Sequence, residues 1–269
     1  MSAVSASLAL QEIAAAIGAA HVLTDPMDVG PHEVEGRGLY KGRALAVLRP
    51  GSTAEVSACV RIAAAHGLPV VAHGGNTGLV GGGVPLDALV LSLQRMNRVR
   101  EVDPVNMTMV AEAGVILANV QAAAEAAGCL FPLSLGAEGT CTIGGNLSTN
   151  AGGTQVLRYG NARELALGLE VVLADGRVLN DLNRLRKNNT GYDLRNLFIG
   201  AEGTLGIITA AVLKLYPRPK ARATAWVGLS SCQAGLELFS RLRTVAGDTL
   251  TGFEFLSDFV LHTVFRHIP

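Results

Sequence analysis

The sequence predicts a globular chain of mixed helices and strands, in an α/β or an α+β arrangement. Three observations support this fold class. Apolar residues make up 49% of the 269 residues and charged residues 16%, so the chain can bury a large core. Strand-like and helix-like segments alternate through its first half. A loop in which glycine predominates directly follows one of the short apolar strands.

An amphipathic helix is the first predicted element, within MSAVSASLALQEIAAAIG. The segment has no basic start, and Gln11 and Glu12 interrupt its apolar run, so a helix is expected here and not a signal peptide. The sequence contains no uninterrupted run of the roughly 20 apolar residues that a membrane-spanning helix requires.

The next elements follow the order strand, helix, strand, loop, strand. Ser52 and Glu55 have capping-box spacing, apolar residues repeat at helical spacing after them, and Gly67 fits a helix C-terminus. These signals predict a helix over about residues 52–67. The accompanying strands are expected at residues 43–50, 68–75 and 87–93.

The second half of the chain repeats this alternation. A helix is expected to end at Gly128, and two apolar runs are expected to form a hairpin through a two-residue turn at Asp175 and Gly176. Proline and charge cluster in residues 217–225, which predicts a domain boundary. Beyond it we expect a strand over residues 223–229 and a helix over residues 231–245.

Composition excludes several classes of function. Lys plus Arg and Asp plus Glu number 22 each, so the chain has no electrostatic signature of nucleic-acid binding, and no such partner is expected. The four cysteines form no CxxC pair and are expected to act as small apolar filler in a reducing compartment. The expected location is the cytoplasm, with peripheral attachment to a membrane left open.

Residues 70–83, VVAHGGNTGLVGGG, carry six glycines in their last ten positions. Clustered glycines allow a ligand to approach the main chain, and consecutive amide N–H groups can bind a phosphate. No lysine follows these glycines as in a P-loop, and the GxGxxG motif of Rossmann folds occurs nowhere in the sequence. Tight turns could explain one such loop. Further small-residue segments at 135–153 and 199–217 favour a long, flat ligand such as a dinucleotide.

Four stretches carry a resemblance to a known family: PVVAHGGNTGLVGGGVP, LGAEGTCTIGGNLSTNAGG, LRYGNARELALGLEVVLADGRVL and LRKNNTGYDLRNLFIGAEGTLGIIT. They resemble the FAD-binding module of the vanillyl-alcohol oxidase / p-cresol methylhydroxylase (PCMH) superfamily. More narrowly, they are similar to its FAD-linked D-2-hydroxyacid dehydrogenase branch, which includes D-lactate dehydrogenases, the glycolate oxidase flavin subunit and D-2-hydroxyglutarate dehydrogenases. The resemblance covers about residues 23–219.

The resemblance implies an α+β fold with a two-subdomain PCMH-type FAD-binding domain at residues 1–219, divided at about residues 103 and 104. An incomplete α/β cap (substrate) domain is implied at residues 220–269. In the family the cap carries a histidine-bearing metal motif and basic residues for the substrate carboxylate. No histidine here has metal-ligand spacing, so no catalytic residue and no metal site is assigned. The chain is expected to be a fragment or a truncated gene product.

The resemblance also implies a set of FAD-binding residues in three groups. The first group would offer backbone N–H groups to the pyrophosphate, the second would line the flavin and its ribityl chain, and the third would close on the cofactor. Core packing is the alternative explanation for individual members. In order, the groups are Gly74, Gly75, Asn76, Thr77, Gly78 and Leu79; Pro132, Leu135, Gly136, Thr140, Gly144, Gly145, Asn146, Thr149, Gly152 and Gly153; and Glu202, Gly206 and Ile208.

The chain departs from the family at His73, where a glutamine usually precedes the paired glycines. Histidines in this region bond covalently to flavin in some relatives, whereas this branch binds FAD non-covalently, and non-covalent FAD is expected here. Residues 31–40 also keep only part of the family's aromatic-rich segment.

The implied reaction is the oxidation of a small D-2-hydroxy acid to the 2-oxo acid, with hydride transfer from Cα to flavin N5. The electron acceptor is not specified, since a quinone, a cytochrome and an electron-transfer flavoprotein all fit, and oxygen is also open. A homodimer is one assembly open to the chain. Two alternatives stay open: a flavin-binding module or subunit without turnover, and relatives with other substrates, such as phenol oxidases or the ether-lipid synthase. Residues 185–194, LRKNNTGYDL, favour the hydroxyacid branch.

Overall fold

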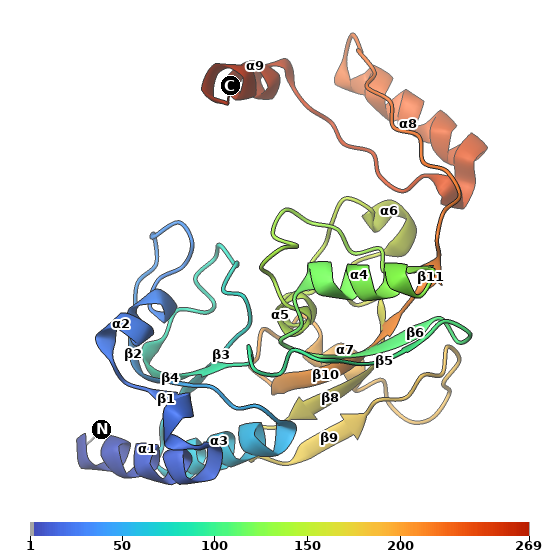
Figure 1. Ribbon diagram of the computed structural model, residues 1–269. Coiled ribbons are helices and arrows are strands. Elements are labelled where there is room, and N and C mark those ends of the chain that lie inside the picture. Colours follow the sequence, from blue (N-terminus) through green and yellow to red (C-terminus); the bar gives the residue numbers. More distant parts are fainter. Residues whose placement is uncertain (1–2, 269) are drawn as a thin grey trace.

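The computed structural model describes residues 3–268, and its N-terminal part forms a four-stranded sheet (Figure 1). The strands lie in the order β1-β2-β4-β3, with β2, β4 and β3 parallel and β1 antiparallel to β2. Helices α1 and α3 pack against each other beside this sheet. The bounds are α1 (Ala3–Ile17), β1 (Val22–Leu23), α2 (Pro26–Val29), β2 (Arg43–Leu48), α3 (Thr53–Ala65), β3 (Val70–His73) and β4 (Leu86–Ser92).

Helix α3 begins and ends where its sequence predicts. The Ser52 hydroxyl accepts a hydrogen bond from the N–H of Glu55 at 3.2 Å, which satisfies a free amide of the first turn. The Glu55 carboxylate accepts from the N–H of Gly51, one residue before the cap. After the helix, Gly67 has a φ of +66°, the left-handed conformation that glycine adopts without steric cost.

The rest of the body is a five-stranded antiparallel sheet in the order β5-β6-β10-β8-β9. Helices α4 and α5 lie over one face of it, and β7 and β11 form a separate short pair (Figure 1). The strands are β5 (Val99–Asp103), β6 (Thr108–Glu112), β7 (Cys129–Leu130), β8 (Ala166–Val172), β9 (Val178–Asp181), β10 (Ile207–Lys214) and β11 (Tyr216–Pro217). The helices are α4 (Leu117–Ala126), α5 (Ile143–Ser148), α6 (Val156–Tyr159) and α7 (Arg195–Phe198).

The α+β class expected from the resemblance is confirmed by this architecture. Strand β5 pairs with β6 in the second sheet, although it precedes the boundary expected at about residues 103 and 104. The change from one sheet to the other therefore lies between Ser92 and Val99. The resemblance implies a division after residue 103, whereas the pairing of β5 places residues 99–103 in the second sheet.

The hairpin β8–β9 is confirmed, but the two-residue turn predicted for it is wrong. The N–H of Leu173 donates to the carbonyl of Arg177, and the N–H of Gly176 donates back to the carbonyl of Leu173, both at 2.8 Å. The turn thus contains three residues, Ala174, Asp175 and Gly176. Gly176 takes a φ of +81°, which places the left-handed residue at the end of a three-residue loop.

This turn also joins the two sheets. The Ser57 hydroxyl of α3 donates to the carbonyl of Gly176 at 2.5 Å, and Thr53 of the same helix donates to Glu170 of β8 at 2.7 Å. One cluster of buried apolar side chains runs through both parts, from Ala9 to Leu215. The two sheets consequently share a continuous core.

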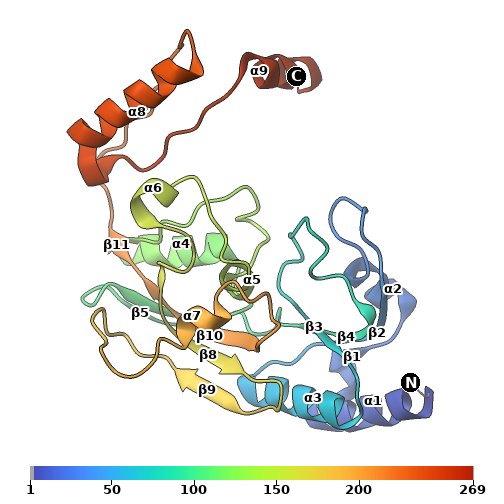
Figure 2. The same cartoon turned by 180° about the vertical axis from the view of Figure 1, so that it is seen from behind.

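The two C-terminal helices lie outside this body, although Gly252 between them packs on the carbonyl of Thr154. Helices α8 (Cys232–Ala246) and α9 (Asp258–His267) extend away from both sheets (Figures 1 and 2). The helix predicted at 231–245 is confirmed, with Ser231 capping it through the N–H of Ala234 at 3.1 Å.

The strand predicted over residues 223–229 is wrong. The segment is irregular and exposed along its whole length, because its backbone lies against no strand edge within residues 3–268. None of the helices in those residues is long and apolar enough to cross a membrane.

Candidate functional site

The three glycine-rich segments meet at one place in the structure, although they are far apart in the sequence. An ideal Cβ on Gly75 would overlap the carbonyl oxygen of Thr140, and one on Gly74 would overlap the Thr142 hydroxyl. A Cβ on Gly82 would lie 2.9 Å from the Glu202 carboxylate. The loop after β3 lies between the loop of residues 33–42 and α5 (Figures 1 and 2). The first, second and third segments therefore form one surface.

Two kinds of glycine on this surface contrast in what surrounds them, and Gly83, Gly145 and Gly152 lie between them with a nearest atom at 3.3–3.5 Å. In the first kind, an added Cβ would lie within 3.0 Å of other chain atoms, so glycine is needed for the chain to pack on itself. In the second kind, Gly78 and Gly136 have no atom within 4 Å of an ideal Cβ, so their main chain faces open space. Only the second kind leaves room for a ligand at the Cα. The first kind comprises Gly74, Gly75, Gly81, Gly82, Gly144, Gly153 and Gly206.

The first loop offers a row of unused hydrogen-bond donors. The six amide N–H groups from Gly74 to Leu79 donate to no acceptor in the described part of the chain. Asn76 takes a φ of +49°, a left-handed conformation that Asn adopts more readily than most residues. Successive free N–H groups in such a loop are typical of an anion-binding concavity. Neutral donors of this kind fit a pyrophosphate without a lysine.

A second loop, residues 33–42, supports the first from outside. The Asn76 side chain donates to the carbonyl of Val34 at 3.1 Å, and the Arg37 guanidinium donates to the carbonyl of Leu79. The ring of Tyr40 packs against Gly81. The shape of the glycine loop thus depends on contacts with this second loop.

Two histidines lie at the base of the glycine loop. His73 is buried, with Nε2 in a hydrogen bond to the carbonyl of Gly83 and Nδ1 at 3.2 Å from Nδ1 of His32. Burial lowers the pKa of His73, and its bond to Gly83 only partly opposes this. Burial also lowers the pKa of His32, assisted by the charges of His73 and Arg49. Both rings are therefore neutral at pH 7.

The second segment contains two buried polar atoms without a partner within residues 3–268. They are Oγ1 of Thr142 and Oδ1 of Asn146, in side chains that are 3% and 5% exposed. The neighbouring N–H of Gly145 donates to no described acceptor either. Buried polar atoms are normally paired, so this cluster leaves hydrogen-bonding capacity for a group that the chain does not supply. Thr142 was missed in the sequence, where only its position inside a predicted flavin-lining segment could have indicated it.

The structure places the other predicted residues in varied surroundings. Thr149 uses its hydroxyl within the chain, donating to the carbonyl of Gly145 at 2.9 Å. Thr140 is exposed, whereas Ile208 is buried inside β10 and pairs with Val171 of β8. Glu202 is exposed with a φ of +52°, and its N–H donates to the carbonyl of Ser148. Pro132 is buried, and Thr77 and Leu135 are half-buried, while Leu79 and Gly152 are exposed.

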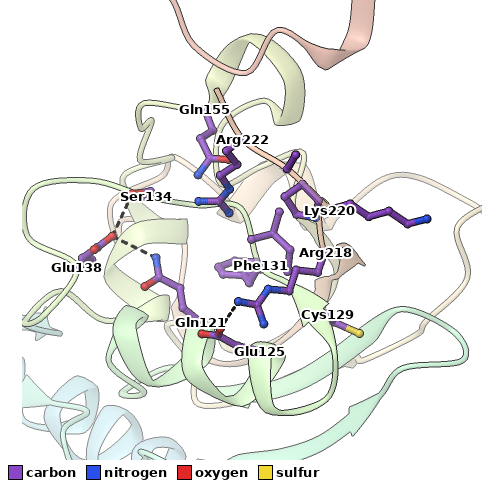
Figure 3. A pocket seen from close by; sticks show the side chains of 13 residues that line it. Gln121, Glu125, Cys129, Phe131, Ser134, Glu138, Gln155, Arg218, Lys220 and Arg222 are labelled. Atoms are coloured by element: carbon purple, nitrogen blue, oxygen red, sulfur yellow. Dashed lines mark hydrogen bonds and ion pairs between the residues drawn. The ribbon is translucent and has the colours of Figure 1, made fainter. Parts of the chain in front are cut away.

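A separate cavity of about 490 Å³ lies between α4 and residues 218–222 (Figure 3). Arg218 pairs with Glu125 across it at 2.6 Å. Glu138 accepts hydrogen bonds from Gln121 and Ser134, each at 3.1 Å, and Lys220 points away from the cavity. Most of its charged groups are thus already partnered. Within residues 3–268, no three His, Cys, Asp or Glu side chains gather in a way that could hold a metal ion.

Comparison with known proteins shows the family to which this chain belongs. A family model described as an FAD binding domain matches residues 44–181, half of the chain. The mitochondrial D-2-hydroxyglutarate dehydrogenase of Danio rerio is 46% identical over 247 residues, which are 91% of this chain and 46% of that protein. The D-2-hydroxyglutarate–pyruvate transhydrogenase of Saccharomyces cerevisiae is 42% identical over 218 residues, 81% of this chain and 44% of that protein. The chain spans about half the length of the curated relatives it matches.

Among solved structures, p-cresol methylhydroxylase with substrate bound shares the fold. Its TM-score is 0.75 at 21% identity, over 91% of this chain and 50% of that one. The expected cytoplasmic location is contradicted by the relatives, since those from Danio rerio, Bos taurus, Rattus norvegicus and Arabidopsis thaliana are named as mitochondrial proteins. The expectation rested on amino-acid composition, which does not specify a cellular compartment.

Proposed function

We propose, because this chain belongs to the FAD binding domain family, that it binds FAD non-covalently where its three glycine-rich segments meet. The observation that carries the proposal is the row of six N–H groups from Gly74 to Leu79, which have no partner within residues 3–268 and are placed against the second segment. A pyrophosphate would accept hydrogen bonds from these groups without a counter-ion from the loop.

The second segment fits the flavin half of the cofactor. The main chain at Gly136 is open, and Asn146 and the N–H of Gly145 hold unused polar capacity in a buried setting. A flat ring that carries carbonyl and imide groups could use both features. The proposed contacts include the residues implied in all three segments, and Thr142 joins them as a buried hydroxyl of the same cluster.

Non-covalent attachment is supported by the surroundings of His73. Its ring is 3% exposed, one nitrogen is bonded to Gly83, and the other faces His32. A covalent bond to flavin needs a histidine nitrogen that is free to reach the ring. Both nitrogens of His73 are already occupied within the protein.

For the reaction, we propose oxidation of a D-2-hydroxy acid, with D-2-hydroxyglutarate as the first candidate from the names of the relatives. FAD, when bound, supplies a two-electron acceptor. The chain's own residues would bind and orient the cofactor, with residues 1–219 as the FAD-binding domain and residues 220–269 as the beginning of a cap. We assign no catalytic base among residues 3–268. The acceptor would be a quinone, a cytochrome or an electron-transfer flavoprotein, and a homodimer is compatible with the proposal.

Reconstitution tests the cofactor part of this proposal. Purified chain mixed with excess FAD and then desalted should keep a yellow chromophore at about 450 nm, a property of oxidised flavin. Acid precipitation should leave that colour in the supernatant, since the attachment is non-covalent. Desalted protein without colour would overturn the site, and colour in the pellet would overturn the non-covalent attachment.

The substrate part needs a separate measurement. Holoprotein is mixed anaerobically with D-2-hydroxyglutarate, and the L enantiomer serves as a control. D-lactate and glycolate are tested separately as alternative substrates. Bleaching of the flavin by the D enantiomer alone supports the proposed reaction. A holoprotein that binds FAD and bleaches with none of these acids would act as a flavin-binding module without turnover.

A further inference from the structure

The glycine loop has almost no hydrogen bonds of its own. Between Gly74 and Val84, the single backbone bond within the described loop joins the N–H of Val84 to the carbonyl of Gly81. Glycine-rich backbone samples many conformations when nothing holds it, and ordering it costs more free energy than ordering other residues. The conformation of this loop therefore has to be imposed by contacts with the rest of the chain, through side chains and through the packing of Gly75 on Thr140.

His73 is the buried member of the set that does so. It ends β3 and immediately precedes Gly74, and its Nε2 bonds the carbonyl of Gly83 at the far end of the loop. One side chain thus joins the two ends of the loop. Of the other contacts, those from Arg37 and Tyr40 come from exposed residues, and the Asn76 side chain bonds the carbonyl of half-buried Val34. A hydrogen bond shielded from water holds a loop more firmly than an exposed one.

The tautomer of His73 follows from its partners. The carbonyl of Gly83 only accepts, so the proton of His73 lies on Nε2. Nδ1 of the neutral ring is then an acceptor, and Nδ1 of His32 at 3.2 Å must donate to it. His32 follows α2, in the short helical turn Gly30–His32. The first part of the chain in this way fixes the ring that closes the glycine loop.

We propose that His73 is a positioning residue that holds the glycine loop in the form that receives the cofactor's pyrophosphate, with His32 orienting its ring. This inference rests on the proposed FAD site. A loop that is held in its bound form before the cofactor arrives loses less conformational entropy on binding. The bond between His73 and Gly83 should therefore raise the affinity of the chain for FAD.

The choice of variants follows from this geometry. His73→Ala removes the bond and leaves Gly83 without its donor. His73→Gln keeps it in principle, since the side-chain amide can donate to Gly83 and its oxygen can accept from His32. His32→Ala leaves the bond to Gly83 and removes only the orienting partner. His66→Ala is the matched control, because His66 is paired with Glu12 at 3.2 Å, away from the loop.

The experiment measures equilibrium binding of FAD and of ADP, which shares the pyrophosphate and lacks the flavin, by calorimetry on desalted apoprotein. We expect His73→Ala to weaken FAD binding by about tenfold or more and ADP binding in proportion. His73→Gln should recover most of the loss, His32→Ala should lose less than His73→Ala, and His66→Ala should match the unmodified chain. Amide hydrogen exchange should accelerate in residues 74–83 of apo His73→Ala and not in His66→Ala.

The outcomes distinguish failure of the proposed FAD site from failure of the positioning role of His73. If the unmodified chain binds no FAD, the proposed function fails. If it binds FAD and folded His73→Ala binds within about twofold of it, the positioning role fails while the site stands. Folded His73→Gln that binds as poorly as His73→Ala would also overturn the role, because the hydrogen bond would then not be the cause. Should His73→Ala not fold, His73→Gln and His32→Ala decide the question by the same comparison.

Discussion

Gly75 and Thr140 touch through their backbones, with so little space that a Cβ on Gly75 would overlap the Thr140 carbonyl oxygen. This contact joins the loop after β3 to the segment before α5, and it brings elements of the two sheets together. The glycine-rich loop is thus shaped by its own protein as well as for a ligand. Substitutions can separate the glycines that are needed for packing from those that leave the main chain open to a ligand.

Gly75→Ala is expected to reduce stability, whereas Gly78→Ala is expected to weaken FAD binding. The first introduces a methyl group where the chain is fully packed and should lower the free energy of unfolding by about 1–3 kcal/mol. The second adds a methyl group with no atom within 4 Å, so stability should change little while FAD binding weakens. Urea unfolding and FAD titration of both variants provide the test. Equal FAD affinity in Gly78→Ala and the unmodified chain would show that the open face of this loop does not meet the cofactor.

Gly176→Ala should loosen the attachment between the two sheets. A Cβ at Gly176 would overlap the Arg61 side chain and lie 3.0 Å from the carbonyl of Ser57, and its φ of +81° disfavours alanine. We expect a loss of about 1–3 kcal/mol in the free energy of unfolding, measured by urea denaturation followed by circular dichroism. Gly228→Ala is the control, because Gly228 has no atom within 4 Å of its Cβ position. Equal losses in the two variants would contradict the docking role of the turn.

Glu112→Gln should destabilise the five-stranded sheet. The buried carboxylate accepts from the backbone and guanidinium of Arg98, each at 2.9 Å, and from Arg100 at 3.3 Å. Removing its charge should cost about 1–3 kcal/mol of unfolding free energy near neutral pH. Glu101→Gln, in an exposed pair with Arg184, should change stability far less.

The stabilisation by the Glu112 carboxylate should depend on pH. Burial alone would raise the pKa of Glu112, but the hydrogen bonds from Arg98 and Arg100 outweigh it and hold the pKa below 4.5. The stabilisation is therefore complete above pH 4.5 and is lost as the pH falls through the lower pKa of the folded state. Unfolding free energies of the unmodified chain and Glu112→Gln should converge in this range. A constant difference between them down to about pH 3 would refute the assignment.

The histidine pair predicts a second pH dependence, in a higher range. The pKa values of His32 and His73 are both lowered from 6.5, so below that value the unfolded chain binds protons that the folded chain does not. Stability should be unaffected by these groups above pH 6.5 and should fall as the pH drops toward the lowered values. His73→Gln should show a shallower fall between about pH 7 and pH 5 in urea unfolding. Parallel slopes for the two proteins would exclude the pair as the cause.

Local signals were sufficient for many elements. Ser52 and Gly67 marked the ends of α3 because capping is a contact between residues a few positions apart. The strands β2, β3 and β4 follow from short apolar runs with clear stops. Two predictions failed where a neighbour mattered more than the pattern. Residues 223–229 have strand-like composition, but the described part of the chain offers them no strand edge to pair with. The turn at Gly176 has a length set by the register of β8 and β9.

By itself, the sequence determined a mixed α/β or α+β chain and its three small-residue segments, because both depend on residue types at short spacing, and the family that these segments resemble implied the α+β class. Only the tertiary structure decided which glycines serve packing and which remain open, since Gly75 and Gly78 differ in what lies across from them and not in their neighbours along the chain. It also decided that His73 closes its loop through Gly83 and meets His32. Contacts of this kind depend on how distant segments pack, which no local pattern encodes.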